Sequence, residues 1–334
     1  MTTLLLNSSQ LTVYLEAGFT DEGKQFSRYL ESIFPNLPAN TRKAIASDWR
    51  QYCQFCLDHG LKPTSDDMES MSSTILSFVD FQSSKLKVNT ISRRIASLKT
   101  IFHAMNVPNP IANDLITKEA VKARLKQIAS PSGQAIPLAR SIIDNYISTL
   151  DFNILIELRT ALILTLAHDT MCRASELANI KVVNITKRFT GNGSVLIERS
   201  KNDKAAIGSY RFIRASTMRI LDLWLTKTRI SEGHLLRPIH AKSNQVYRLK
   251  DGQKSEPINY STILKAFHSV SGTDTYTAHS ARVGSALEQI EAGINSQKIQ
   301  LAGGWKSPHM IAYYGRQLDD QNSGSAELAK LHGE

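Results

Sequence analysis

Two arginines, a histidine, a tryptophan and a late tyrosine follow one another in the C-terminal part of the chain. They are Arg173, His279, Arg282, Trp305 and Tyr314. A guanidinium group can hold two phosphate oxygens and stays charged at any working pH, and an indole N–H can only donate. A tyrosine hydroxyl, with an ordinary pKa near ~10, becomes a nucleophile where clustered positive charge stabilises the phenolate and the transition state. We therefore predict a site that attacks a phosphodiester without a metal ion.

Each of these residues, taken singly, also has an ordinary structural explanation. Arg173 and Glu176 are three residues apart and could form a surface ion pair. His279 and Arg282 have the same spacing and could mark a capped helix start, and Trp305 could be a core residue. The catalytic interpretation is favoured by the order of several unlike residues in register.

The composition points to a globular protein with a polyanionic partner. The chain has 334 residues, 42% of them hydrophobic, which is enough for two ordinary domains. Its net charge of +10 suggests nucleic acid first, although a basic protein without such a partner is the alternative. Cys53 and Cys56 lie on a helical pattern with no second pair to complete a zinc site, so both are expected to be core thiols in a reducing compartment.

The chain shows no pattern of a secretion signal or of a membrane span. Its most apolar stretch, 154–167, is interrupted by Glu157 and Arg159 and indicates a core helix. We expect a cytoplasmic protein that can reach DNA.

Composition and periodicity divide the chain into four parts. We expect a loose N-terminal tail over 1–20, a helical core DNA-binding domain over 21–128, a linker over 129–135, and a catalytic domain over 136–334. The catalytic domain should include a C-terminal helix at 319–332.

Local signals predict mainly helices with one small antiparallel hairpin. Thr41 and Thr90 are candidate N-caps of two core helices, and Gly60 stands where the first should end. Residues 193–200 and 209–213 have the pattern of two paired strands, with the turn between them.

Basic side chains cluster on the outer faces of the predicted N-terminal helices. Such a face can enter the major groove and hold phosphates, although a solvated helix surface is the alternative. The candidate DNA contacts are Lys85, Lys87, Arg93, Arg94, Lys99, Lys118 and Lys122.

The ordered set resembles the catalytic residues of a known family. Arg173 with Glu176, the run 279–284, the Gly-Gly-Trp of 303–305 and Tyr314 are similar to the tyrosine recombinases (the phage integrase family), most closely to the Cre-like site-specific recombinases. The resemblance covers the whole catalytic half and, more weakly, the helical half. It implies an N-terminal helical bundle and a tyrosine-recombinase catalytic domain that together form a C-shaped DNA clamp.

The resemblance also implies a role for each residue. Tyr314 would attack the scissile phosphate and form a 3′-phosphotyrosyl link, with Tyr313 as the competing nucleophile. Arg173 and Arg282 would hold the non-bridging oxygens.

The remaining catalytic roles follow from the same resemblance. His279 and Trp305 would donate further hydrogen bonds, and Glu176 would order the site by orienting His279. Lys201 in the hairpin turn would protonate the leaving 5′ oxygen, with Lys204 as its competitor.

The implied reaction is conservative site-specific recombination through a Holliday junction. The partner would be double-stranded DNA with an inverted-repeat target site, bound by a homotetramer of two dimers that is monomeric when free. The helix at 319–332 would dock into a neighbouring protomer. No cofactor, metal ion, small-molecule substrate or membrane would be needed, and the setting would be the prokaryotic nucleoid, in a phage or plasmid context.

Two other functions remain open at this point. A type IB topoisomerase would use a similar site, as a monomer, to relax supercoiled DNA of any sequence. A non-catalytic DNA-binding protein would bind DNA without a covalent adduct.

Overall fold

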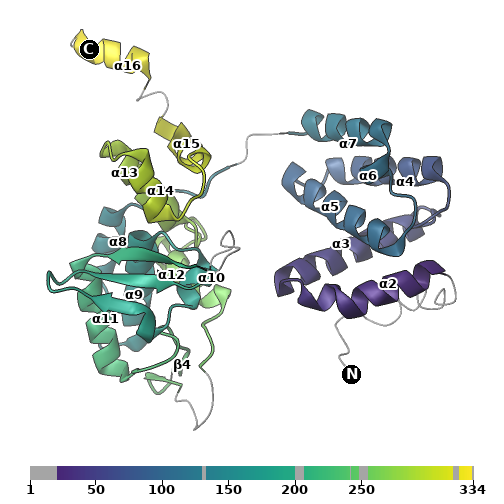
Figure 1. Ribbon diagram of the computed structural model, residues 1–334. Coiled ribbons are helices and arrows are strands. Elements are labelled where there is room, and N and C mark those ends of the chain that lie inside the picture. The colour runs from purple at the N-terminus through teal and green to yellow at the C-terminus, as the bar shows by residue number, and fades with distance from the viewer. Residues whose placement is uncertain are drawn as a thin grey trace. The chain divides into compact units, whose positions relative to one another are not determined.

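The computed structural model describes residues 21–129, 133–199, 207–240, 242–247, 255–318 and 323–332. The chain divides into two compact units between residues 132 and 133, inside the segment expected to be a linker. Each unit is described by itself, and Figure 1 identifies their elements.

The N-terminal unit consists of helices. Its elements are α2 (Asp21–Ser32), η1 (Phe34–Asn36), α3 (Ala39–Asp58), α4 (Met68–Ser83), α5 (Val88–Met105), α6 (Pro110–Asn113) and α7 (Leu115–Gln127). Two of these helices begin at aspartates, because the Asp67 carboxylate accepts from the amide of Ser70 and Asp114 accepts from that of Thr117. The predicted N-caps are wrong: α3 and α5 begin at Ala39 and Val88, before Thr41 and Thr90, and their N-cap residues Pro38 and Lys87 make no side-chain cap.

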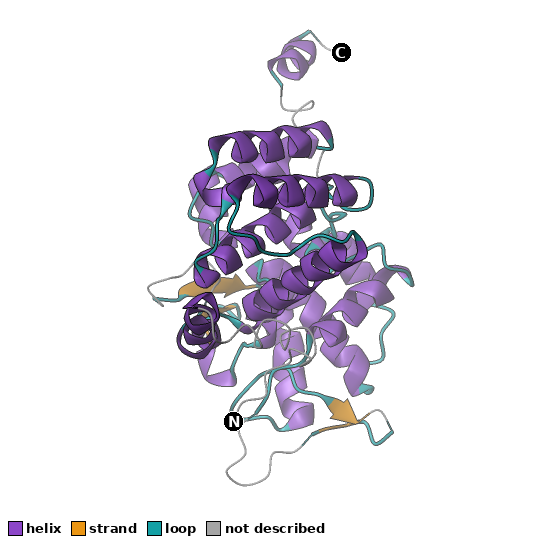
Figure 2. Ribbon diagram, turned by 90° about the vertical axis from the view of Figure 1, so that its right-hand side faces the viewer, coloured by secondary structure: helices purple, strands orange, loops and turns teal. Residues whose placement is uncertain are grey.

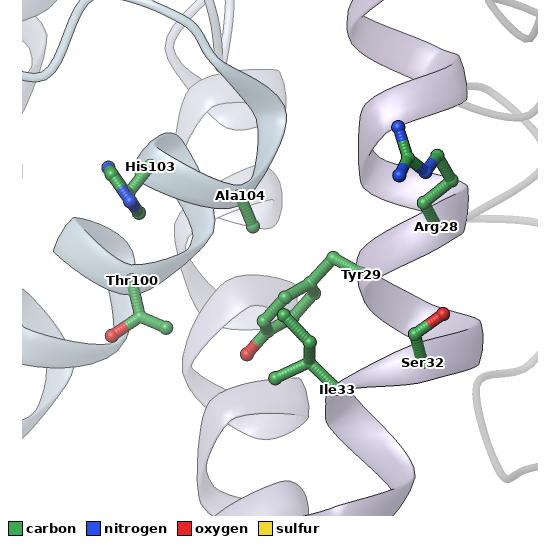
Figure 3. Close-up of a pocket in the computed structure, with 7 residues that line it drawn as sticks. All are labelled: Arg28, Tyr29, Ser32, Ile33, Thr100, His103 and Ala104. Carbon is green, nitrogen blue, oxygen red and sulfur yellow. The ribbon is translucent and has the colours of Figure 1, made fainter.

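Aromatic rings from α3, α4 and α5 form the centre of this unit. The Tyr52 ring meets Phe78 and Phe102 edge-on, at centroid distances of 5.2 and 5.8 Å. A pocket of about 540 Å³ lies between α2 and α5, where Tyr29 reaches from one helix toward Thr100 on the other (Figure 3). It contains none of the residues that were predicted to be catalytic.

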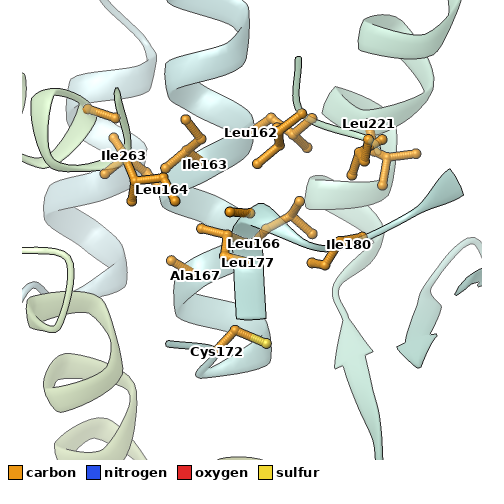
Figure 4. Packing of buried hydrophobic residues seen from close by; sticks show 14 of the residues in the cluster. Leu162, Ile163, Leu164, Leu166, Ala167, Cys172, Leu177, Ile180, Leu221 and Ile263 are labelled. Atoms are coloured by element: carbon orange, nitrogen blue, oxygen red, sulfur yellow. The ribbon is translucent and has the colours of Figure 1, made fainter. Parts of the chain in front are cut away.

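The C-terminal unit is also mainly helical. Its helices are α8 (Arg140–Ile147), α9 (Leu155–Thr170), α10 (Ala174–Ala178), η2 (Val182–Asn184), α11 (Ala215–Thr228), α12 (Tyr260–Ser271), α13 (Ser280–Glu291), α14 (Ser296–Gly303), α15 (His309–Gly315), η3 (Arg316–Leu318) and α16 (Gly324–Leu331). Helix α9 is buried along most of its length and contacts α8, α10, α11, α12, α13 and a strand. Figure 4 shows the apolar side chains that pack around it. A helix that is apolar on all sides is typical of such a central position.

Two small antiparallel sheets complete this unit (Figure 2). The first has the order β1 (Ile185–Lys187), β2 (Gly193–Ile197) and β3 (Ser209–Ile213), and the second pairs β4 (Ile239–His240) with β5 (Gln245–Val246). Val195 pairs with Arg211, which confirms the predicted hairpin. The mainly helical fold with a small antiparallel sheet is likewise as predicted.

Helix α13 packs closely against the segment that enters the C-terminal unit. The Leu138 amide donates to the Ser280 carbonyl at 3.0 Å. A Cβ at Gly284 would lie 2.1 Å from the Leu138 carbonyl oxygen, so only glycine allows this approach. In the part of the chain that the structure describes, no helix has both the length and the apolar character needed to span a bilayer.

Candidate active site

Arg173 stands where the chain leaves α9 and begins α10. Met171 ends α9 in the left-handed conformation, with φ of 51°, and Arg173 is the N-cap residue of α10. Glu176, three residues on, reaches back to accept from the Arg173 amide at 2.9 Å and from its Nη1 at 2.8 Å. The Glu176 carboxylate therefore fixes Arg173. This differs from the expectation that it would orient His279.

Arg282 lies in the first turn of α13 and is 2% exposed. Its Nη1 donates to the Met171 carbonyl, and its Nη2 donates to the Gly303 carbonyl at 2.8 Å. These two bonds tie together three parts of the chain that are far apart in sequence. Burial, with the positive charge of Arg173, lowers the pKa of Arg282.

Trp305 follows the end of α14 and packs against the same arginine. The guanidinium carbon of Arg282 lies 4.9 Å from the centroid of the Trp305 ring, a cation–π distance. The indole nitrogen Nε1 is buried and meets no hydrogen-bond partner among the described residues. It is a donor without an acceptor, in a place where an anionic oxygen could supply one.

Tyr314 on α15 is 2% exposed and lies beside these groups. Its hydroxyl oxygen is 2.7 Å from Nε2 of His279, the N-cap residue of α13. Its ring stacks on that of Trp305 at 5.2 Å. The α13–α15 region therefore unites His279, Arg282, Trp305 and Tyr314.

The charges of the site act on both members of the hydrogen-bonded pair. Burial lowers the pKa of His279 to about 4, and the positive charges of Arg282 and Arg173 act in the same direction. Burial raises the pKa of Tyr314, while the same two arginines oppose that shift. The imidazole is therefore neutral at pH 7, so its Nε2 can accept a hydrogen bond from the Tyr314 hydroxyl.

The remaining predicted catalytic residues are the two candidate acids and the competing nucleophile. Lys201 and Lys204 lie outside the described residues. Tyr313, the competing nucleophile, lies next to Tyr314 with its ring 5.5 Å away, and its carbonyl accepts from the side-chain Nε2 of Gln134. Among the described residues, no group of three or more His, Cys, Asp or Glu side chains could hold a metal ion.

The basic residues predicted to contact DNA fall into two groups. Arg93 and Arg94 on α5 lie against the carboxylate of Asp48, which is 1% exposed. Arg94 also donates to the Gln82 side chain at 2.8 Å.

The lysines of the same prediction lie closer to the surface. The Lys85 ammonium sits 3.9 Å above the Phe81 ring, and Lys122 pairs with Glu119 at 3.4 Å on an exposed face. Lys87, Lys99 and Lys118 lie on or beside α5 and α7.

Arg211 is one of the buried arginines that were not singled out from the sequence. Arg211 on β3 donates to the Leu301 carbonyl near the end of α14. The alternation of the strand could have identified it. Ile213 faces inward, so Arg211, two residues earlier, must face inward as well.

Comparisons with known proteins show the family to which this chain is similar. The model of the phage integrase family matches residues 144–321, more than half of the chain. An integrase/recombinase XerD homolog of Selenomonas ruminantium is 26% identical over 82% of this chain and 81% of its own length. The recombinase Cre of Escherichia phage P1 is 23% identical over 86% of this chain and 87% of its own.

Solved structures show the same fold. The XerH site-specific recombinase bound to palindromic difH substrate has a TM-score of 0.60 at 14% identity and covers 98% of this chain and 91% of that one. A lambda integrase fragment, a dimer bound to a core site, has a TM-score of 0.58 at 17% identity, with 91% and 94% covered. The chain belongs to the phage integrase family, the tyrosine recombinases, which cleave and rejoin DNA.

Proposed function

We propose that this protein is a Cre-like site-specific recombinase that cleaves each DNA strand through Tyr314. The observation that supports this most strongly is the 2.7 Å contact between the Tyr314 hydroxyl and Nε2 of His279, beside the buried Arg282. In this proposal Tyr314 is the nucleophile, His279 is the base and Arg282 supplies the fixed positive charge.

The chemical step follows from these groups. The Tyr314 oxygen forms a bond to the scissile phosphorus while its proton passes to neutral His279. The bond from phosphorus to the 5′ oxygen breaks, and Lys201, or Lys204 in its place, supplies the proton to that oxygen. The product is a 3′-phosphotyrosyl link and a free 5′-hydroxyl, and because the phosphodiester is exchanged for another ester, no external energy source is required.

Arg173, Arg282 and Trp305 would bind the non-bridging phosphate oxygens. Arg282 is held by two main-chain carbonyls and Arg173 by Glu176, so neither guanidinium has to be ordered when the substrate arrives. The unpartnered indole N–H of Trp305 would complete its hydrogen bonding with such an oxygen. Donors fixed in advance lower the barrier because no reorganisation is needed during the reaction.

The proposal also includes the target DNA and the oligomeric state of the protein. Solved relatives are bound to a palindromic substrate and to a core site. We propose that this chain binds an inverted-repeat duplex with both units, as a tetramer of two dimers, and recombines it through a Holliday junction in the bacterial cytoplasm. Leu328 and Leu331 on α16 are exposed and suit docking of the helix onto a neighbouring protomer.

The test uses a nicked duplex that traps the covalent intermediate. A target duplex is first selected from a random library by repeated binding to the protein. Tyr314→Phe should abolish the adduct and keep the binding affinity within about twofold, since only a hydroxyl is removed. Tyr313→Phe is the matched control and should still form the adduct.

Other outcomes would point to the alternatives. An adduct that persists in Tyr314→Phe and disappears in Tyr313→Phe would move the nucleophile by one residue. Binding without any adduct from the unmutated protein would indicate a non-catalytic DNA-binding protein. Relaxation of supercoiled plasmids that lack the selected site would indicate a topoisomerase.

A further inference from the structure

Arg211 occupies a position where a strand normally carries an apolar side chain. On β3, Tyr210 and Phe212 are exposed, whereas Arg211 and Ile213 point inward, and Arg211 is only 5% exposed. Lys and Arg side chains are rarely buried unless they are paired. Within the described ranges, no carboxylate lies within ion-pairing distance of Arg211, so its charge must be stabilised in another way.

The end of helix α14 supplies that stabilisation. Nη1 of Arg211 donates to the carbonyl of Leu301, which lies in the last turn of α14. The Leu301 carbonyl also accepts from the Gly304 amide at 3.3 Å, and because the last carbonyls of a helix carry partial negative charge, a cation there is favourable. Arg211 therefore caps α14 from a neighbouring strand.

The guanidinium also packs directly on the turn that follows α14. A Cβ on Gly304 would lie 1.7 Å from Nη2 of Arg211, and Gly304 has a φ of 61°. A side chain at this position would both strain the backbone and displace the guanidinium. Glycine at position 304 leaves the space that the Arg211 guanidinium fills.

Arg282 holds the same turn from its other side. Its Nη2 donates to the Gly303 carbonyl at 2.8 Å, and its guanidinium lies against the Trp305 ring. Two buried arginines thus bind carbonyls two residues apart, just before Trp305. One of them, Arg282, belongs to the proposed catalytic set, and the other does not.

We propose that Arg211 is a positioning residue of the catalytic site, which fixes the turn of residues 303–305 so that Arg282, Trp305 and Tyr314 meet in their reactive arrangement. The inference rests on the proposed function, because it concerns the geometry of that site. Arg211 touches no reacting atom and acts through the main chain of α14.

The measurement is the single-turnover rate of adduct formation on the nicked duplex at saturating DNA. A displacement of about 1 Å in an active site can cost about 100-fold in rate. Arg211→Met should slow the reaction by about 10- to 100-fold and leave DNA affinity within about twofold. Arg211→Lys should be intermediate, because it keeps the charge at the helix end and loses the planar fork.

A double-mutant cycle with Trp305→Phe separates positioning from a general loss of stability. If Arg211 acts by placing Trp305, the two losses in rate will not multiply, and the double variant will be about as slow as the slower single variant. Fully multiplicative losses would overturn the proposal. Arg188→Met is the matched control: this exposed arginine in the turn between β1 and β2 also donates to a carbonyl, that of Gly193, and its loss should not change the rate.

A second variant covers the case in which Arg211→Met does not fold. Gly304→Ala retains the arginine and pushes its guanidinium away from α14, so it should slow the reaction in the same range. Unchanged rates in the folded variants, with normal adduct formation by the unmutated protein, would overturn this inference alone. If the unmutated protein forms no adduct, the proposed function fails and this inference with it.

Discussion

Two arginines of the C-terminal unit and the lysines of the N-terminal unit differ in burial. Arg282 and Arg211 are buried, and main-chain carbonyls fix them beside the phenol of Tyr314 or beside the turn that carries Trp305. The lysines of α7 are exposed, as the 76% exposed side chain of Lys122 illustrates.

The difference in burial follows from the accuracy of placement that catalysis and DNA-backbone contact each require. Transition-state stabilisation requires donors placed within fractions of an ångström, and burial supplies that order. Contact with the DNA backbone depends mainly on charge and the release of counterions, which mobile lysines provide. Arg93 and Arg94 fall between these cases, because the buried Asp48 already engages them.

Lysine-to-alanine substitutions in the two units should therefore have opposite kinetic signatures. Lys201→Ala should slow cleavage at saturating DNA by about 100- to 10,000-fold, as expected for the loss of a general acid, without weakening binding. A 5′-thio leaving group, which departs without a proton, should restore the rate. The assay is single-turnover cleavage of matched oxygen and sulfur substrates.

Lys204→Ala is the control for this prediction. It should behave like the unmutated protein with both substrates. If sulfur rescues Lys204→Ala instead, the acid is Lys204, and if it rescues neither variant, the acid is another group.

Stability should reveal the burial of His279 through its pH dependence. Its folded pKa of about 4 lies below the ordinary ~6.5, so the unfolded chain binds the proton more tightly. Stability is thus lost as the pH falls below about 6.5, and the loss levels off below about 4. Between pH 7 and pH 5 the unmutated protein should lose on the order of 2 kcal/mol more than His279→Asn, measured by urea unfolding of both proteins.

Direct observation of the imidazole makes this prediction sharper. In protein with labelled histidines, the resonance that is missing from His279→Asn should titrate near pH 4. A midpoint close to the ordinary value of ~6.5 would show that this side chain is solvated, and would contradict its burial beside Tyr314.

The smallest effect is expected in the N-terminal unit. Lys118→Ala or Lys122→Ala should weaken DNA binding by only a few-fold and lower the slope of log K against log salt by about 0.9 for each phosphate that the variant no longer neutralises. The rate at saturating DNA should not change. Binding isotherms at several salt concentrations test this, and an unchanged slope in both variants would mean that α7 does not contact the backbone.

The sequence identified the proposed catalytic residues, which the structure brings together, more completely than it identified the features of the helical unit. Arg173, His279, Arg282, Trp305 and Tyr314 differ in type and keep a fixed order, so their joint occurrence is informative. The strand at 209–213 was also predicted with its observed bounds, because alternating residues follow a turn.

Features that depend on tertiary contacts were not predictable in this way. Nothing local distinguishes Arg93 and Arg94, which lie against Asp48 more than 40 residues away, from solvated arginines of the same helix face. Spacing predicted the ion pair of Arg173 and Glu176, but not the capping bond from the Arg173 amide to the Glu176 carboxylate. Thr90 failed as a cap because α5 begins two residues earlier, at Val88.

The central claim is that the Tyr314 oxygen becomes esterified to DNA, and peptide mapping of the trapped adduct tests it most directly. The complex formed on the nicked duplex is digested with a protease and a nuclease, and mass spectrometry locates the residue that keeps a nucleotide. The account predicts one modified tyrosine, Tyr314, joined to a 3′ phosphate. A nucleotide on Tyr313 or on any other side chain, or a link to a 5′ phosphate, would contradict it.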